Sequence, residues 1–202
     1  MRKKGNKRIN KDIYIYCEGS TEVEYIKMLK SKYSRKNVTV NPISLDGANQ
    51  QGIVQIVSKK ISAKKKRSTD FEVYICLDKD SLTPNDLQKI YAEAKREDFG
   101  LIYSSTCFEV WILSHFQKVN SIKSQTWLYD EVGKNLGINH YSNHKGENDY
   151  RKFSSKLKDL VNVAYANTSY MGTIKNSINF FSQNLYTNAG ESIKKIFQTE
   201  KL

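Results

Sequence analysis

Short apolar segments without polar alternation recur through the first half of the chain. They are rich in β-branched and aromatic residues, as in "IYIYC" and "FEVYICL". Strands that are covered on both faces have this composition, because neither face meets water. The pattern predicts four buried strands, at residues 13–17, 38–45, 71–77 and 99–105.

Amphipathic segments with helix-start signals separate these strands. After the first strand and a tight turn, Thr21 and Glu24 have the spacing of a capping box. After the third strand, Thr83 precedes a proline at the first helical position, and Asp86 follows three residues later. Between these two lies the helical pattern "QGIVQIVSKKI". Strands that alternate with helices in this way predict an α/β fold, with a mainly parallel sheet and crossover helices.

The character of the sequence changes near residue 107. The segment "CFEVWILSHF" predicts a helix that is apolar nearly all round, and the remainder consists mostly of polar helix-like segments with Asn, Ser and Gly between them. We therefore expect an α/β domain over residues 12–106 and a helical C-terminal part, residues 107–202, packed on it. Residues 1–11 would form a basic arm, for which disorder is one interpretation.

Positive charge is in excess and is concentrated in two places. The chain has 33 Lys and Arg against 21 Asp and Glu, a net charge of +12. Besides the N-terminal arm, "KKISAKKKR" at 59–67 holds six basic side chains. Such clusters favour a nucleic-acid partner, because each neutralised phosphate releases counterions; a solubilising surface is the alternative. The candidate contacts are Lys59, Lys60, Lys64, Lys65, Lys66 and Arg67.

Several classes of protein are excluded by what the sequence lacks. No apolar run approaches the roughly 18 residues of a membrane-spanning helix. The basic N-terminus leads into a strand pattern rather than a signal-peptide apolar region, so we expect a cytoplasmic protein without a membrane partner. Cys17, Cys76 and Cys107 show no CxxC spacing, which indicates buried free thiols rather than a zinc site or disulfides.

Three carboxylates directly follow predicted strands. Glu18 follows the first strand, and Asp78 and Asp80 follow the third. Ligands of parallel sheets bind beyond the carboxyl ends of the strands. In an extended backbone, side chains two residues apart leave on the same side, so the two aspartates could converge on one cation. Magnesium, or manganese in its place, fits this pattern, because it takes one or two carboxylates together with phosphate oxygens. Turn-capping aspartates and a solvent-facing Glu18 are the alternatives.

Glu109 is the one acid within the predicted apolar helix. It shares a helix face with Leu113 and Phe116. A buried carboxylate needs a partner, because burying an isolated charge is prohibitive. Interaction with the helix N-terminus is one interpretation. His115 is its partner, a separate site residue or a structural histidine.

Together the segments "CEGSTEVEY", "LDKD", "SSTCFEVWILSHF" and "NLYTNAGESIKKI" resemble the RloB-like family, which is associated with abortive infection and restriction loci of bacteria. The resemblance extends over nearly the whole chain. That family in turn resembles the Toprim proteins, a fold shared by topoisomerases, primases and OLD nucleases. In Toprim enzymes the glutamate after the first strand is a general acid or base, and a DxD pair binds magnesium. The resemblance thus implies a Toprim-like fold.

The same resemblance implies roles for individual residues. Glu22 matches the family's second glutamate, and Glu109, Trp111 and His115 match its "FExWxxxH" signature. The implied catalytic residues are Glu18, Glu22, Glu109 and His115. The implied metal ligands are Asp78, Asp80 and Glu18.

Our first hypothesis is a magnesium-dependent nuclease of bacterial phage defence that cuts RNA, with tRNA as one candidate, or DNA. The alternative is a nucleic-acid-binding or sensing component of a defence system without its own catalysis, whose chemistry is done by a partner such as an ATPase. A primase-like nucleotidyl transferase ranks below both, because the sequence shows no recognisable nucleotide-binding signature.

Overall fold

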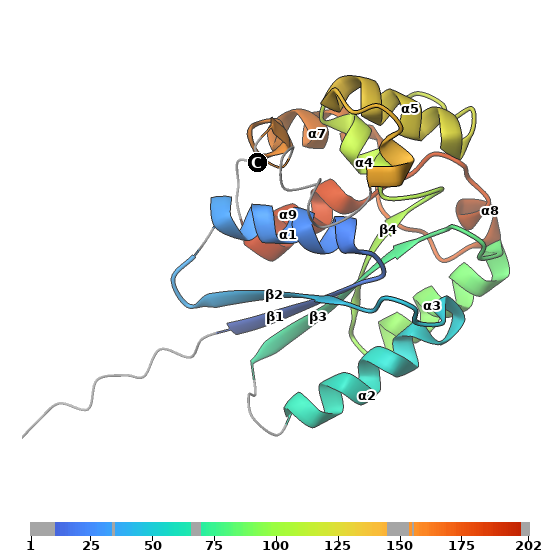
Figure 1. Cartoon of the computed structure of the whole chain (residues 1–202). Helices are drawn as coiled ribbons and strands as arrows, with labels where there is room; N and C mark the ends of the chain where they lie inside the picture. Colours follow the sequence, from blue (N-terminus) through green and yellow to red (C-terminus); the bar gives the residue numbers. More distant parts are fainter. Residues whose placement is uncertain (1–10, 34, 66–69, 145–153, 155, 199–202) are drawn as a thin grey trace, which may run out of the picture.

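The structure is a computed structural model that describes residues 11–33, 35–65, 70–144, 154 and 156–198. Residues 1–10 of the expected basic arm lie outside this range, as do Lys66 and Arg67. The chain forms an α/β fold with one parallel sheet, helices on both of its faces and a helical C-terminal part (Figure 1). This arrangement confirms the predicted fold class.

The sheet has four strands in the order β2-β1-β3-β4, and every neighbouring pair is parallel. Their bounds are β1 (Lys11–Cys17), β2 (Val38–Ser44), β3 (Phe71–Asp78) and β4 (Gly100–Ser104). Side chains alternate between two cores: Ile15 and Cys17 point to one face, and Tyr16 points to the other. The strand segments are continuously apolar because both faces are covered.

Each face of the sheet carries its own layer of helices. One core includes α1 (Ser20–Lys32) and α9 (Ala189–Phe197), and the other includes α2 (Ile53–Lys65) and α3 (Pro84–Arg96) (Figure 1). A turn of 3-10 helix, η1 (Gln50–Gly52), precedes α2. Because α9 comes from the end of the chain, the C-terminal part completes a layer of the α/β core.

The remaining helices follow β4. They are α4 (Glu109–Ser114), α5 (Gln125–Leu136), α7 (Val161–Thr168) and α8 (Ile178–Phe181), with 3-10 turns η2 (Tyr141–His144) and η3 (Ser169–Met171). Every residue of α4 is buried, and this helix contacts α5 and α7. The helix predicted as apolar all round is therefore confirmed, although it is shorter than the predicted segment.

The two predicted helix starts have different outcomes. The start of α3 after Thr83 is confirmed, and it forms a capping box: Thr83 Oγ1 accepts from the Asp86 backbone N–H at 3.2 Å, and the Asp86 carboxylate accepts from the Thr83 backbone N–H at 3.1 Å. The box at α1 is wrong. That helix begins two residues earlier, with Gly19 as its N-cap and no side-chain cap, so Thr21 and Glu24 already lie inside it.

The three cysteines are free and buried, as predicted. Within the described part of the chain, every helix is too short or too polar to span a lipid bilayer.

Candidate active site

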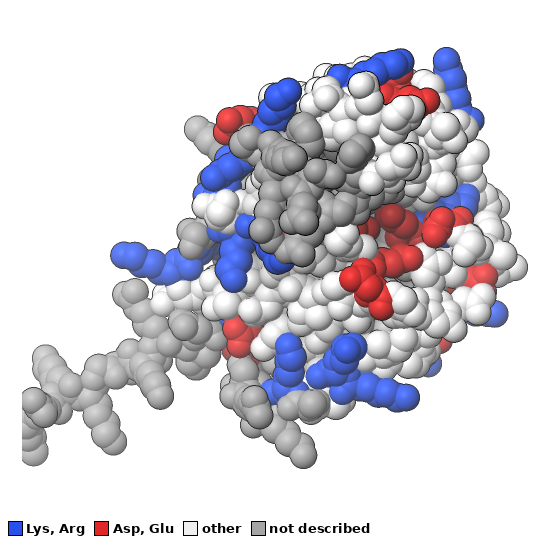
Figure 2. Space-filling model, in the orientation of Figure 1, with Lys and Arg blue, Asp and Glu red and all other residues white. Residues whose placement is uncertain are grey.

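A cavity of about 270 Å³ lies where the central strands end. Cys17 of β1 pairs with Cys76 of β3, so the residues that follow these strands emerge side by side at one edge of the sheet. The acids that line the cavity are Glu18, Asp46, Glu22, Asp78 and Glu109. Figure 2 shows acidic side chains gathered on one part of this face, with Lys and Arg around it.

Four of the predicted site residues are thus brought together from β1, α1, β3 and α4. The fifth acid, Asp46, was missed. It follows the end of β2, which is the signal that could have found it, because β2 ends at the same edge as β1.

Glu22 enters the cavity from the first turn of α1 and is 5 % exposed. The turn before it is closely packed, since a Cβ added to Gly19 would lie 2.8 Å from Glu22 Oε2. A glycine at this position therefore lets the strand turn directly into the helix while the carboxylate stays in the cavity. The helix N-terminus favours a negative charge here.

Asp78, the last residue of β3, is the most perturbed acid. Its pKa is raised well above the usual range, first by burial and then by the negative charges of Glu22 and Glu109, whereas a hydrogen bond from the Phe108 backbone N–H acts in the opposite direction. Its Oδ1 is buried and has no hydrogen-bond partner among the described residues. A cation would neutralise this group of like charges and give the oxygen a partner.

Glu18, like Asp78, has a raised pKa and a buried oxygen without a partner among the described residues, but its pKa is shifted less. Burial raises its pKa, a hydrogen bond from Gln50 Nε2 to Oε1 lowers it, and the charge of Asp80 raises it further. Its other oxygen, Oε2, is buried without a partner among the described residues. Gln50 lies in η1 and was not expected at the site. Its position before α2 gave no sequence signal.

Asp80 does not lie as predicted. β3 ends at Asp78, and Asp80 has a left-handed φ of +37°, so the rule for an extended backbone does not apply to the pair. Its side chain is exposed and does not line the cavity. Across the described residues, no group of three His, Cys, Asp or Glu side chains forms a ready-made metal cluster.

Glu109 is 1 % exposed, and Tyr141 Oη donates a hydrogen bond to its Oε1 at 3.3 Å. The buried carboxylate thus has a hydrogen-bond partner that sequence reasoning missed, because Tyr141 lies 32 residues further along the chain in η2.

His115 is a core residue rather than part of the cavity lining, and it is 1 % exposed. Its Nδ1 lies 3.0 Å from the Trp111 carbonyl oxygen, and its Nε2 lies 2.9 Å from Tyr25 Oη. A carbonyl can only accept, so Nδ1 carries the proton and Nε2 accepts from the tyrosine. Burial lowers the pKa of His115 to about 4. The imidazole is therefore neutral near pH 7, and it ties α4 to α1, the two helices that carry Glu109 and Glu22.

The basic cluster of α2 lies apart from the acidic cavity. Lys59 and Lys60 are exposed, and the Lys64 ammonium lies 4.1 Å from the centre of the Tyr14 ring. At about 1.5 Å per residue, the helix carries Lys64 roughly 16 Å beyond its first residue, Ile53. A ligand that contacts both the cavity and this cluster must therefore be extended.

In a comparison with known protein families, the family model described as RloB-like protein matches residues 13–196, a range that contains every acid of the cavity. A comparison with curated proteins found no match.

Proposed function

The chain belongs to the RloB-like family, and we propose that it is a metal-dependent nuclease that acts in bacterial phage defence. The nuclease proposal depends above all on two buried carboxylate oxygens, Glu18 Oε2 and Asp78 Oδ1, which lack a partner among the described residues. They line one acidic cavity in a protein of net charge +12. The family's association with abortive infection and restriction loci supports the defence role.

The cavity suits a hard divalent cation such as Mg²⁺ or Mn²⁺, because its charged groups are carboxylates. Asp78 would hold the cation, with Glu22 on α1 beside it. Asp80 would join them only after a rotation of the turn that follows β3. When bound, the cation would polarise a phosphoryl oxygen and offset the charge that develops on it.

Glu18 is the proposed general acid or base. Burial raises its pKa, which is the direction that favours proton transfer, because an efficient general acid or base has a pKa closer to the working pH than an ordinary carboxyl group has. The hydrogen bond from Gln50 fixes one carboxylate oxygen and leaves the other for a water molecule or a leaving oxygen. Glu109 acts on the site through its charge, which raises the pKa of Asp78.

The proposed substrate is RNA, including tRNA, or DNA. A polynucleotide is an extended anion and can reach both the cavity and the lysines of α2. These lysines would contact phosphates of the nucleic-acid backbone at a distance from the cavity. Lys59 and Lys60 are the described members of this surface with exposed side chains.

A second candidate function is a binding or sensing component whose partner, such as an ATPase, performs the chemistry. Two observations favour it: the described residues contain no ready-made metal cluster, and Glu109 is already hydrogen-bonded by Tyr141. In that case the acids would stabilise the turns between strands and helices.

Incubation of the purified protein with end-labelled tRNA and duplex DNA, with Mg²⁺, with Mn²⁺ or with EDTA, tests the proposal. We expect cleavage of at least one substrate that depends on the metal. An Asp78→Asn protein purified in the same way reports contaminating nucleases, and Asp130→Asn, an exposed acid of α5, is the matched control. Binding without cleavage under every condition would support the second candidate instead.

A further inference from the structure

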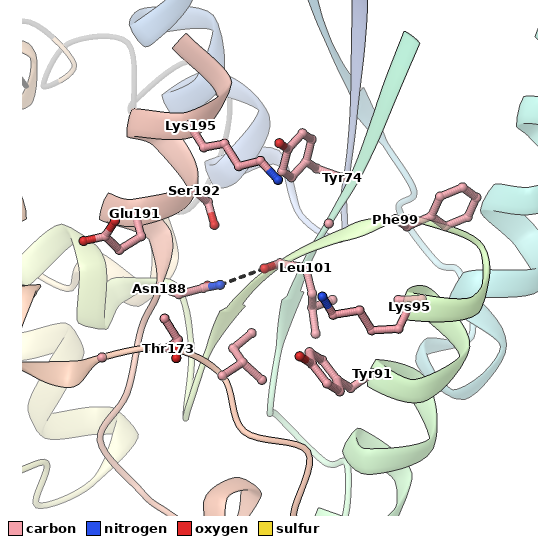
Figure 3. Close-up of a pocket in the computed structure, with 14 residues that line it drawn as sticks. Tyr74, Tyr91, Lys95, Phe99, Leu101, Thr173, Asn188, Glu191, Ser192 and Lys195 are labelled. Atoms are coloured by element: carbon pink, nitrogen blue, oxygen red, sulfur yellow. Dashed lines mark hydrogen bonds between the residues drawn. The ribbon is translucent and has the colours of Figure 1, made fainter. Parts of the chain in front are cut away.

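A second and larger cavity, of about 460 Å³, lies beside the edge strand β4, between α3 and α9 (Figure 3). It shares no lining residue with the acidic cavity. Tyr74, one of its residues, pairs with Gly100, whereas Asp78 pairs with Ser104. Four residues of strand separate the two positions, a distance of about 13 Å. This edge cavity therefore lies outside the proposed reaction site.

Asn188 closes one end of the edge cavity. Its Nδ2 donates to the Leu101 carbonyl oxygen at 2.8 Å, and its Oδ1 accepts from the Tyr103 backbone N–H at 2.7 Å. The side-chain amide thus occupies the place where the next strand of the sheet would pair. An added peptide strand could not continue past Leu101, so the cavity suits a compact ligand rather than strand addition.

Two tyrosine rings line the cavity: Tyr74 is 4 % exposed and forms its floor, and Tyr91 is half-buried. The Tyr74 ring lies against Gly100, where an added Cβ would be 2.4 Å from Tyr74 Cδ1. Tyr74 Oη donates to Glu72 Oε2 at 3.2 Å, which fixes the ring further. Tyr91 projects from α3 on the other side (Figure 3). Rings held in this way can pack against a planar ligand.

Two lysines bring positive charge to the same cavity from different helices. The Lys95 ammonium lies 5.8 Å from the Tyr91 ring centre, and the Lys195 ammonium lies 5.9 Å from the Tyr74 ring centre. Figure 3 shows both lysine side chains extending toward the cavity. Glu191 is the acid among the described lining residues, and its carboxylate accepts from Tyr165 Oη at 3.0 Å. The two lysines therefore bring two positive charges to the lining, against the one negative charge of Glu191.

We propose that the edge cavity binds a mononucleotide, with its base against the tyrosine rings and its phosphate at Lys95 and Lys195. The volume falls within the roughly 300–1,000 Å³ of small-molecule sites. Lysine is a common phosphate partner, and its charge at the cavity mouth need not be desolvated to act. Ser192 and Thr173 offer hydroxyl groups for the ribose between the two ends.

Calorimetric titration with AMP in EDTA and low salt tests this proposal. We expect saturable binding of one AMP per chain, roughly tenfold or more tighter than binding of adenosine or inorganic phosphate, because AMP joins both halves of the ligand. Equal affinity for phosphate and AMP would overturn the role of the rings, and absence of saturable AMP binding would overturn the site. The titration requires no metal, so its outcome is independent of whether the protein cleaves nucleic acid.

The double variant Lys95→Gln/Lys195→Gln should weaken AMP binding by about tenfold or more and leave adenosine binding near the original value. Lys89→Gln/Lys194→Gln is the matched control. It removes the same charge from the same two helices at positions that do not line the cavity. An equal loss of affinity in the control would show general electrostatic attraction and overturn the assignment. Circular dichroism of all samples identifies any variant that fails to fold.

Discussion

The acidic cavity and the edge cavity lie toward opposite ends of the same parallel strands, and their charges are fixed in different ways. In the acidic cavity, carboxylates emerge directly from strand ends and first helical turns, and burial with mutual repulsion raises the pKa of Asp78 and Glu18. In the edge cavity, the charges sit at the tips of exposed lysines, while rings and the Asn188 amide form the rigid part. The acidic cavity therefore favours a cation, and the edge cavity favours a planar ligand that carries an anionic group at one end.

The largest effect is expected for Asp78→Asn. Loss of one cation ligand should reduce metal-dependent cleavage on the order of 100-fold or more, since metal stabilisation of the transition state amounts to several kcal/mol. The thermal midpoint in EDTA should stay the same or rise, because a repelling charge is removed. Cleavage titrated with Mg²⁺ and melting curves on the same samples measure both. A fall of several degrees with an unshifted Mg²⁺ midpoint would instead identify Asp78 as a structural residue.

Glu18→Gln separates proton transfer from metal binding within the acidic cavity. We expect cleavage to fall by about 100-fold, the usual scale of general acid–base catalysis, while Mg²⁺ binding is largely retained. Glutamine keeps the size of the side chain and removes its charge. If Mg²⁺ affinity, measured by calorimetry, falls as far as activity does, Glu18 is a ligand rather than the proton-transfer group.

The pH dependence of the free energy of unfolding, measured without metal, distinguishes Asp78 in the acidic cavity from His115 in the hydrophobic core. A carboxyl group whose pKa is raised by folding reduces stability as the pH rises from its unfolded value, 3.8 for Asp78, through its folded value. His115 acts in the opposite direction: its pKa falls from 6.5 to about 4 on folding, so stability is lost as the pH falls through that interval. The two effects oppose each other in the wild-type protein.

The Asp78→Asn variant loses the aspartate effect and keeps the histidine effect. The free energy of unfolding should therefore decline more steeply from pH 6.5 to 4 in this variant, by about 1 kcal/mol or more for each unit of pKa shift removed. Urea unfolding in EDTA at several pH values measures it. If the free energy of unfolding has the same pH dependence in the wild-type protein and in Asp78→Asn, folding does not raise the pKa of Asp78.

The smallest expected effect belongs to Gly100→Ala, which disturbs the edge cavity alone. The new methyl group would displace the Tyr74 ring, so AMP affinity should fall a few-fold and stability should drop by about 1–3 kcal/mol. Gly52→Ala is the control, since its Cβ would meet only Gln55 at an ordinary 3.7 Å. Unchanged AMP affinity in Gly100→Ala would argue against a ring-stacked base.

The features that could be predicted from the sequence are those that depend on residues close together in the chain. The strands were visible because both faces of the sheet are buried, and Glu18 and Asp78 were visible because each follows a strand. The turn after β3 was not, since the left-handed φ of Asp80 depends on loop packing rather than on strand alternation. Tyr141 was missed because its bond to Glu109 spans 32 residues.

The edge cavity could not be predicted either. Its residues come from β3, α3, β4, α9 and the segments that follow η3 and precede α9, and only the return of the chain end to the sheet brings them together. Contacts between segments so far apart in the sequence leave no pattern in the spacing of residues.

The position of the Asn188 amide also affects the tendency of this protein to aggregate with other copies of itself. An open strand edge is a template for aggregation, because its free N–H and C=O groups pair with any extended chain. Asn188 occupies that position on β4, and at the opposite edge Pro42 of β2 lacks an N–H to offer. The sheet is thus blunted on both sides, and a crowded solution of this protein should resist joining sheet to sheet into fibres.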